Sequence, residues 1–289
     1  MAIGSLAAAQ TSAGVPRQIL ARRVGAMRHA APVRDKGRTR SRPERQPHDR
    51  RSAAMASAPT DPPPLTRLLA EATALLPSPL WARACRRIAG FHHGDGRRVI
   101  VIPGFLAGDL LTRRLRRTLK QAGYRPEGWG QGIDWGVRRE LFDRLVARID
   151  GGTAPVVLLG WSLGGLYARE AAKLRVDRVD RVITLGSPFS GDPHANNAWK
   201  AYEAINRHPV DDPPLDVDLP AKPPVPTFAL WSPIDGIVAP AAARGLPGES
   251  DRRIAVPCRH IDFCYSPLAI AAVLDAISER MAPPPPPTP

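Results

Sequence analysis

The sequence predicts an α/β fold in which a mostly parallel sheet of about six strands is covered by helices on both faces. Short, continuous apolar runs alternate with amphipathic segments of helical periodicity along most of the chain. The apolar runs have no polar side, which is typical of strands buried on both faces of a parallel sheet. Hydrophobic residues make up 43% of the 289 residues, enough for a large core. Strand–helix alternation of this kind favours parallel strands joined by crossover helices.

Six segments have the character of strands. The run RRVIVIPGF stays apolar until Pro-Gly ends it, and PVVLLG and DRVITLGSP have the same character. A weaker candidate at about 125–129 lies between two amphipathic segments. The expected strands are 97–105, 125–129, 155–160, 180–188, 227–233 and 252–258.

Helices are expected between these strands. Leucines recur at helical spacing from Leu65 to Leu76, and Gly123 and Gly151 follow two further amphipathic segments, where glycine commonly ends a helix. Residues 189–224 interrupt the alternation, because they are rich in Pro, Asp and Asn and contain a single helical piece at about 196–206. The other expected helices are 109–124, 138–150, 163–174 and 268–281.

These elements form one predicted domain, 65–281, between two tails. Residues 1–64 are rich in Arg, Ala and Pro and are expected to be disordered, and the proline tail 282–289 cannot extend a helix. Met55 would make a natural start, so we interpret 1–54 as upstream sequence included through a misassigned start codon. The alternatives for this segment are a transit peptide or a nucleic-acid-binding arm.

The net charge of +14 is mostly a property of the N-terminal tail. Residues 1–54 contain 12 Lys/Arg and 3 Asp/Glu, whereas the rest of the chain contains 29 and 24. The basicity therefore says little about the partner of the folded part, and we expect no nucleic-acid partner.

Cysteine usage and hydropathy exclude two further classes of protein. Cys85, Cys258 and Cys264 lack CxxC spacing and cannot make a disulfide framework, so we interpret them as buried thiols of a cytoplasmic protein. No apolar run approaches 18 residues, which argues against a stable membrane span. We expect no cofactor and no metal site, and the oligomeric state stays open.

The segment Gly160-Trp161-Ser162-Leu163-Gly164 joins a predicted buried strand to a predicted helix. The pattern Gly-x-Ser-x-Gly alone is weak evidence for a catalytic serine. Here it stands between a strand and a helix, which is the arrangement of a nucleophile elbow. A serine in a strained turn needs neighbours without side chains, because strand and helix pass too closely for a Cβ. The alternative is a glycine-rich turn that binds phosphate at a helix N-terminus, but neither GxGxxG nor a P-loop pattern is present. We predict that Ser162 is a nucleophile.

An elbow serine requires a base, and an acid followed by a histidine is expected further along the chain. His260 follows the last predicted strand, where a loop would carry it over the sheet edge; the alternative is a surface histidine. Asp235 follows the penultimate strand and would orient the imidazole and stabilise its charged form; the alternative is an ordinary Asp-Gly turn. We predict that Asp235 and His260 complete a catalytic triad.

The developing oxyanion requires two backbone N–H donors. Leu163, the residue after the predicted nucleophile, would supply one of them. The second is expected from the loop IPGFLAGD after the first strand, with Phe105 as the donor because Gly104 permits a tight turn. The alternative is that Pro-Gly only terminates the strand.

The motifs PGF, GWSLGG, LGSPF, an Asp-Gly acid loop and a late H-x-x-F resemble those of the α/β-hydrolase superfamily, in particular bacterial esterase/lipase-like proteins. The resemblance spans about 97–281. It implies a minimal α/β-hydrolase fold that lacks the two opening strands, with Ser162, Asp235 and His260 as the triad of an acyl-serine mechanism.

The interruption at 189–224 stands where this superfamily places a small cap or lid. Trp199, Tyr202 and Ala204 would present an apolar face there, with Trp231 and Phe105 beneath it. We name Trp199, Tyr202 and Trp231 as candidate substrate-binding residues. A helix packed on the domain surface is the alternative.

The resulting hypothesis is a serine hydrolase that cleaves small-molecule or lipidic carboxylic esters. The same triad would serve an acyltransferase or a thioesterase. Whether water or another molecule accepts the acyl group depends on how much water enters the pocket, not on the nucleophile. A non-catalytic scaffold with this fold is disfavoured by the complete set of Ser, Asp and His.

Overall fold

The computed structural model describes residues 61–75 and 78–280. The tails predicted at 1–64 and 282–289 lie outside the described residues, apart from 61–64. The interpretation of 1–54 falls outside them as well.

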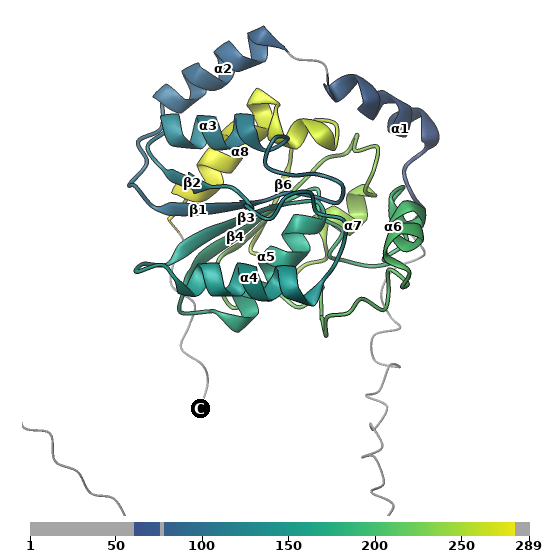
Figure 1. Ribbon diagram of the computed structural model, residues 1–289. Coiled ribbons are helices and arrows are strands. Elements are labelled where there is room, and N and C mark those ends of the chain that lie inside the picture. Colours follow the sequence, from purple (N-terminus) through teal and green to yellow (C-terminus); the bar gives the residue numbers. More distant parts are fainter. Residues whose placement is uncertain (1–60, 76–77, 281–289) are drawn as a thin grey trace, which may run out of the picture. The chain divides into compact units, whose positions relative to one another are not determined.

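The described residues form one six-stranded sheet in which every neighbouring pair of strands is parallel. The strand order is β2-β1-β3-β4-β5-β6, so the chain goes from β1 to the edge strand β2 and then crosses the sheet in the other direction, from β3 to β6 (Figure 1). The prediction of a mostly parallel sheet of about six strands is confirmed. The strands are β1 Arg98–Ile102, β2 Arg125–Glu127, β3 Val156–Trp161, β4 Val179–Leu185, β5 Thr227–Trp231 and β6 Arg252–Ala255.

Helices cover both faces of the sheet (Figure 1). Side chains alternate along a strand, and in β1 Val99 and Val101 pack in one hydrophobic cluster while Ile100 and Ile102 pack in the other. The first cluster lies under α2, α3 and α8, and the second lies under α4 and α5. These helices are α2 Pro79–Gly90, α3 Arg113–Gln121, α4 Arg139–Asp150, α5 Leu163–Leu174 and α8 Pro267–Ser278.

The described residues also form three shorter helices: α1 Leu65–Glu71, α6 Trp199–Asn206 and α7 Pro240–Arg244. The helix expected from Leu65 onward ends at Glu71 and continues as a 3₁₀ turn, Ala72–Leu75. The sequence prediction contained neither α2 nor α7. The start of α2 carries a recognisable signal, because Ser78 accepts a hydrogen bond from the Trp81 N–H and Pro79 occupies the first turn.

All three cysteines are buried and free, as the sequence predicts. Burial raises the pKa of each thiol. They contribute apolar volume to the core rather than a reactive surface.

Candidate active site

Ser162 occupies a sharp turn between the end of β3 and the start of α5. Its φ of 55° and ψ of −122° lie in a region that residues with a side chain rarely adopt. A Cβ at Gly160 would lie 2.3 Å from the Gly164 carbonyl oxygen, and one at Gly164 would lie 2.4 Å from that of Ile102. The expected absence of room for a Cβ at both flanking glycines is confirmed, and the turn presents Ser162 at the carboxyl edge of the sheet.

Asp235 and His260 are both buried and lie on the loops that follow β5 and β6. The Nδ1 atom of His260 and Oδ2 of Asp235 are 2.8 Å apart. The other oxygen of Asp235 accepts the N–H groups of Ile237 and Val238, each at 2.8 Å. The carboxylate is thus fixed by its own loop, and its free side faces the imidazole.

Trp161 connects this pair to the turn that carries Ser162. Its indole N–H donates to the His260 carbonyl at 3.1 Å, and the two ring centroids are 5.7 Å apart. In the part of the chain that the structure describes, the Ser162 hydroxyl makes no hydrogen bond, either to His260 or to another residue. The structure therefore brings the three residues to one edge of the sheet and joins two of them directly.

A parallel sheet with a serine elbow after β3, a carboxylate after β5 and a histidine after β6 has a defined chain order and geometry. This is an α/β-hydrolase fold. The α/β-hydrolase sheet here consists of six strands within the described residues, so the predicted minimal form is also the one observed.

Solved structures resemble this α/β-hydrolase fold at low sequence identity. A methylesterase from Arabidopsis is 15% identical, with 63% of this chain and 99% of that chain covered and a TM-score of 0.44. A pyrethroid hydrolase from Sphingobium faniae is 19% identical, with 63% and 98% covered and a TM-score of 0.46. The thioesterase domain from the curacin biosynthetic pathway is 14% identical, with 63% and 92% covered and a TM-score of 0.42. No family model and no curated protein matches the chain.

The electrostatic surroundings of His260 favour its charged form. Burial by itself lowers the pKa of the imidazole, but the charge and hydrogen bond of Asp235 and the charge of Glu71 together raise this pKa above 6.5, its ordinary value. A positive charge on the imidazole of His260 is therefore stabilised by its surroundings.

Two backbone N–H groups near Ser162 are free in the described residues. The Phe105 N–H takes no part in the hydrogen bonds outside helices and strands, and Leu163 is the first residue of α5, where an N–H has no partner within the helix. Leu106 is excluded as a donor, because its N–H donates to the Asp134 carbonyl at 2.7 Å. Of these two neighbouring residues, Phe105 is therefore the one whose backbone N–H is free in the described residues.

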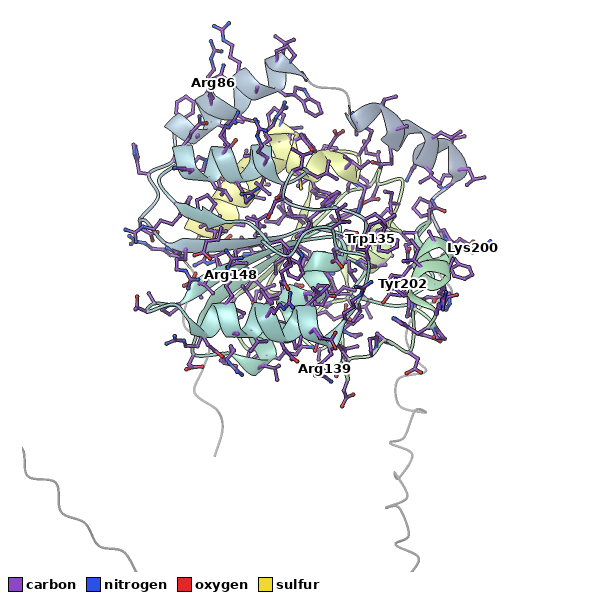
Figure 2. All side chains as sticks on the ribbon, viewed as in Figure 1. Arg86, Trp135, Arg139, Arg148, Lys200 and Tyr202 are labelled. Carbon is purple, nitrogen blue, oxygen red and sulfur yellow. The ribbon has the colours of Figure 1, made fainter. Side chains whose placement is uncertain are left out.

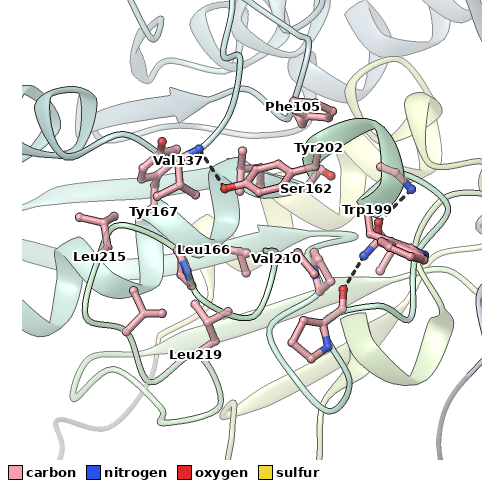
Figure 3. A pocket seen from close by; sticks show the side chains of 18 of the residues that line it. Phe105, Val137, Ser162, Leu166, Tyr167, Trp199, Tyr202, Val210, Leu215 and Leu219 are labelled. Carbon is pink, nitrogen blue, oxygen red and sulfur yellow. Dashed lines mark hydrogen bonds between the residues drawn. The ribbon is translucent and has the colours of Figure 1, made fainter. Parts of the chain in front are cut away.

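An apolar cavity of about 100 Å³ lies between α5 and the insertion at 189–224, with Ser162 in its lining (Figure 3). Trp199 and Tyr202 line the cavity as the sequence predicts, and the Tyr202 ring packs on Phe105 at a centroid distance of 5.5 Å. The Tyr202 hydroxyl accepts the Val137 N–H at 3.3 Å, so α6 contacts the loop that carries the exposed Trp135 (Figure 2). Glu170 and Asn196 are polar members of the lining, and its other apolar residues include Leu163, Leu166, Val210, Leu215, Val217 and Leu219.

Trp231 is not among the residues that line this cavity, contrary to its prediction as a substrate-binding residue. Its side chain leaves the end of β5 toward a cluster that includes Ala195 and Val238. The Arg244 guanidinium lies over its ring at 5.6 Å. The alternation of side chains along β5 places Trp231 in this packing role.

Arg169 on α5 holds the end of the insertion. It is fully buried and donates to the carbonyl groups of residues 219–221 and of Glu249 at 3.1–3.2 Å, while its guanidinium lies 4.1 Å from the Phe189 ring centroid. Burial lowers its pKa to about 10, which still leaves it charged at neutral pH. The helix that begins beside Ser162 therefore also fixes one wall of the cavity.

Glu71 is the site residue that the sequence analysis missed. It is buried in α1, and its carboxylate accepts N–H groups from the loops of both Asp235 and His260. A possible signal was its spacing, because Glu71 lies three residues after Leu68 on the helix face that the leucine pattern assigned to the core.

Within the described residues, no group of three or more His, Cys, Asp or Glu side chains is arranged to hold a metal ion. The helices of the described part are too short or too polar to cross a membrane.

Proposed function

We propose that the protein is a serine hydrolase that cleaves carboxylic esters through an acyl-serine intermediate. The observation that carries the proposal is the buried 2.8 Å contact between His260 and Asp235 beside the turn that presents Ser162. In the proposed first step, the Ser162 hydroxyl attacks the ester carbonyl as His260 takes its proton, and Asp235 stabilises the imidazolium. His260 then gives the proton to the leaving alcohol. In the second step, a water molecule loses a proton to His260 and attacks the acyl-serine, and His260 returns this proton to the Ser162 oxygen as the acid leaves.

The proposed oxyanion donors are the N–H groups of Phe105 and Leu163. Both are free in the described residues, and loss of one such donor typically costs about 3–4 kcal/mol of transition-state stabilisation. Trp199 and Tyr202 are proposed to contact the acyl group or an aromatic part of the ester, because both line the cavity that reaches Ser162. Its apolar lining supports an uncharged, apolar substrate.

Labelling with a fluorophosphonate probe tests this function. The wild-type protein should be labelled and Ser162→Ala should not, because the probe phosphonylates an activated serine. Equal labelling of the two proteins would contradict the assignment. p-Nitrophenyl esters of increasing acyl length would then define the substrate, whereas activity confined to thioesters or to acyl transfer would favour those chemistries instead.

The pH dependence of hydrolysis should report on His260. As a general base it must be neutral, so kcat/KM is expected to fall as the pH drops through the pKa of His260. Asp235 and Glu71 raise this pKa, so the midpoint should lie above 6.5, and Asp235→Asn should move it downward. The measurement is kcat/KM for an uncharged ester from about pH 5 to about pH 9, spanning the ordinary histidine pKa. A wild-type midpoint at or below 6.5 would contradict the assignment.

A further inference from the structure

In helix α1 the carboxylate of Glu71 is buried against the domain, whereas two of the three leucines, Leu65 and Leu69, are exposed. Glu71 is 3% exposed, whereas Leu65 and Leu69 are 70% and 74% exposed. Burial of a carboxylate is unfavourable unless its oxygens are hydrogen-bonded, while burial of leucine is favourable. An arrangement that buries the glutamate and leaves these two leucines in solvent therefore needs a specific partner for Glu71.

That partner is the backbone of two separate loops. Oε1 of Glu71 accepts the Gly236 N–H at 2.9 Å and the His260 N–H at 2.8 Å, and Oε2 accepts the Ile261 N–H at 3.0 Å. No Lys, Arg or His side chain forms a salt bridge with Glu71 among the described residues. One carboxylate thus bridges the loop after β5 and the loop after β6.

Both bridged loops carry a member of the proposed triad. Gly236 directly follows Asp235, and His260 donates its own N–H to Glu71. Apart from Glu71, the two loops are joined by the short pairing of β5 with β6, which ends at Trp231 and Ala255, and by the Ser232 hydroxyl, which donates to the Cys258 carbonyl and accepts the Cys258 N–H. The 2.8 Å contact between Asp235 and His260 therefore depends on how these loops are held beyond the ends of the strands.

The lack of room for a side chain at Gly236 shows independently that α1 lies close to the loop of Asp235. A Cβ at this position would lie 2.4 Å from the Arg67 carbonyl oxygen and 2.9 Å from Oε1 of Glu71. The backbone of α1 thus lies directly against the loop of Asp235. Further contacts reach the same two loops, because Arg67 donates to the Pro233 carbonyl at 2.9 Å and Arg259 donates to the Ala70 carbonyl at 3.2 Å.

We propose that Glu71 is a positioning residue for the acid–base pair, and that its carboxylate holds the loops of Asp235 and His260 at the separation that proton transfer requires. The inference rests on the proposed hydrolase function. Glu71 acts through His260 and Asp235 and does not line the cavity at Ser162.

The charge of Glu71 has a second effect on His260. Together with Asp235 it raises the pKa of the imidazole. The other charged groups nearby are Asp262 and Arg259, which pair with each other at 2.6 Å. The neighbouring thiols of Cys258 and Cys264 are neutral, because burial raises the pKa of each. Loss of the Glu71 charge should therefore lower the pKa of His260.

Glu71→Gln keeps the shape and one acceptor oxygen but removes the charge. We expect kcat for an activated ester to fall by about 10- to 100-fold with KM within about twofold, because proton transfer rather than binding is affected. The midpoint of the fall in kcat/KM on the acid side of the pH profile, called the acid limb, should move to lower pH by at least about half a pH unit. Gly236→Ala keeps the charge and displaces α1, so kcat should fall there as well.

Asp251→Asn is the matched control. Asp251 also bridges two segments, since it accepts the Thr227 N–H at 2.8 Å and pairs with Lys222. It lies just before the first residue of β6, at the amino ends of the strands, whereas Asp235 and His260 lie beyond their carboxyl ends. Its kcat and acid limb should equal those of the wild type, even if its melting temperature falls. If Glu71→Gln matches this control in kcat and in pH profile, Glu71 has only a structural role and the inference is wrong.

A proton NMR spectrum provides a readout that does not depend on turnover. The Nδ1–H of His260, bonded to Asp235, should give a downfield resonance that shifts or disappears in Glu71→Gln and stays unchanged in Asp251→Asn. If the wild type neither hydrolyses esters nor reacts with a fluorophosphonate, the proposed function is wrong. If the wild type is active and the resonance is insensitive to Glu71→Gln, only the inference is wrong.

Discussion

Replacement of Ser162 by alanine is expected to lower kcat/KM for ester hydrolysis by about 10⁶-fold, because loss of the nucleophile removes the whole acyl-serine route. The fold should persist. The Ser162 hydroxyl makes no hydrogen bond among the described residues, and alanine must adopt the same backbone conformation. The free energy of unfolding should therefore change by less than about 1 kcal/mol. Steady-state kinetics and urea unfolding of the same preparation would measure both quantities.

Ser187→Ala is a suitable control for this variant. Ser187 is also buried close to α5, and its hydroxyl has no partner in the described part of the chain. Removal of an unsatisfied buried hydroxyl is close to neutral or stabilising, so kcat/KM should stay within about twofold of the wild type. Ester hydrolysis that survives in Ser162→Ala at the level of Ser187→Ala would show that another residue is the nucleophile.

Gly164→Ala is expected to have the largest effect on stability, at a cost of about 3 kcal/mol in the free energy of unfolding. Its Cβ would lie 2.4 Å from the carbonyl oxygens of both Ile102 and Pro103, which are backbone atoms that cannot rotate away. Helix α5 and the loop after β1 would have to separate, and the N–H groups of Phe105 and Leu163 would move apart. We therefore expect kcat/KM to fall by at least about 10²-fold.

Gly151→Ala distinguishes this steric effect from the general effect of replacing glycine. A Cβ at Gly151 would meet its nearest atoms at 3.6 and 3.7 Å, and the φ of −69° at this helix end suits alanine. Its stability should be unchanged or increase by up to about 1 kcal/mol. A Gly164→Ala protein as stable and active as Gly151→Ala would contradict the close packing of α5 on β1.

The sheet and the elbow were predictable from the sequence because their signals are local. A short apolar run such as Val156–Trp161, bounded by turn residues, is typical of a strand buried on both faces, and Gly160 and Gly164 mark the place where a helix crosses it closely. The chain order of Ser162, Asp235 and His260 then restricts the positions of acid and base. The buried contact between the last two agrees with that prediction, although their catalytic role stays a proposal.

The sequence analysis missed Glu71 and misplaced Trp231, because both depend on contacts between distant segments that no local pattern in the sequence indicates. The leucine spacing predicted α1 as a helix, but its docking is decided by three N–H groups on two loops distant in the sequence, which bind the buried carboxylate of Glu71. Trp231 was assigned to the cavity from its place at the end of a strand, yet the side of the sheet that it faces depends on the register of β5. Aromatic character indicates burial but not the surface on which a residue is buried.

Arg169 has a consequence for how this protein would select among substrates. The guanidinium that donates to the carbonyl groups of residues 219–221 belongs to the helix that begins at Leu163, so Leu219 is held at a fixed distance from Ser162, the proposed nucleophile. A flexible covering would accept acyl groups of many sizes by yielding. A covering anchored in this way cannot yield to a longer acyl group. We therefore expect the rate of hydrolysis to differ strongly between esters whose acyl groups differ by one or two carbon atoms.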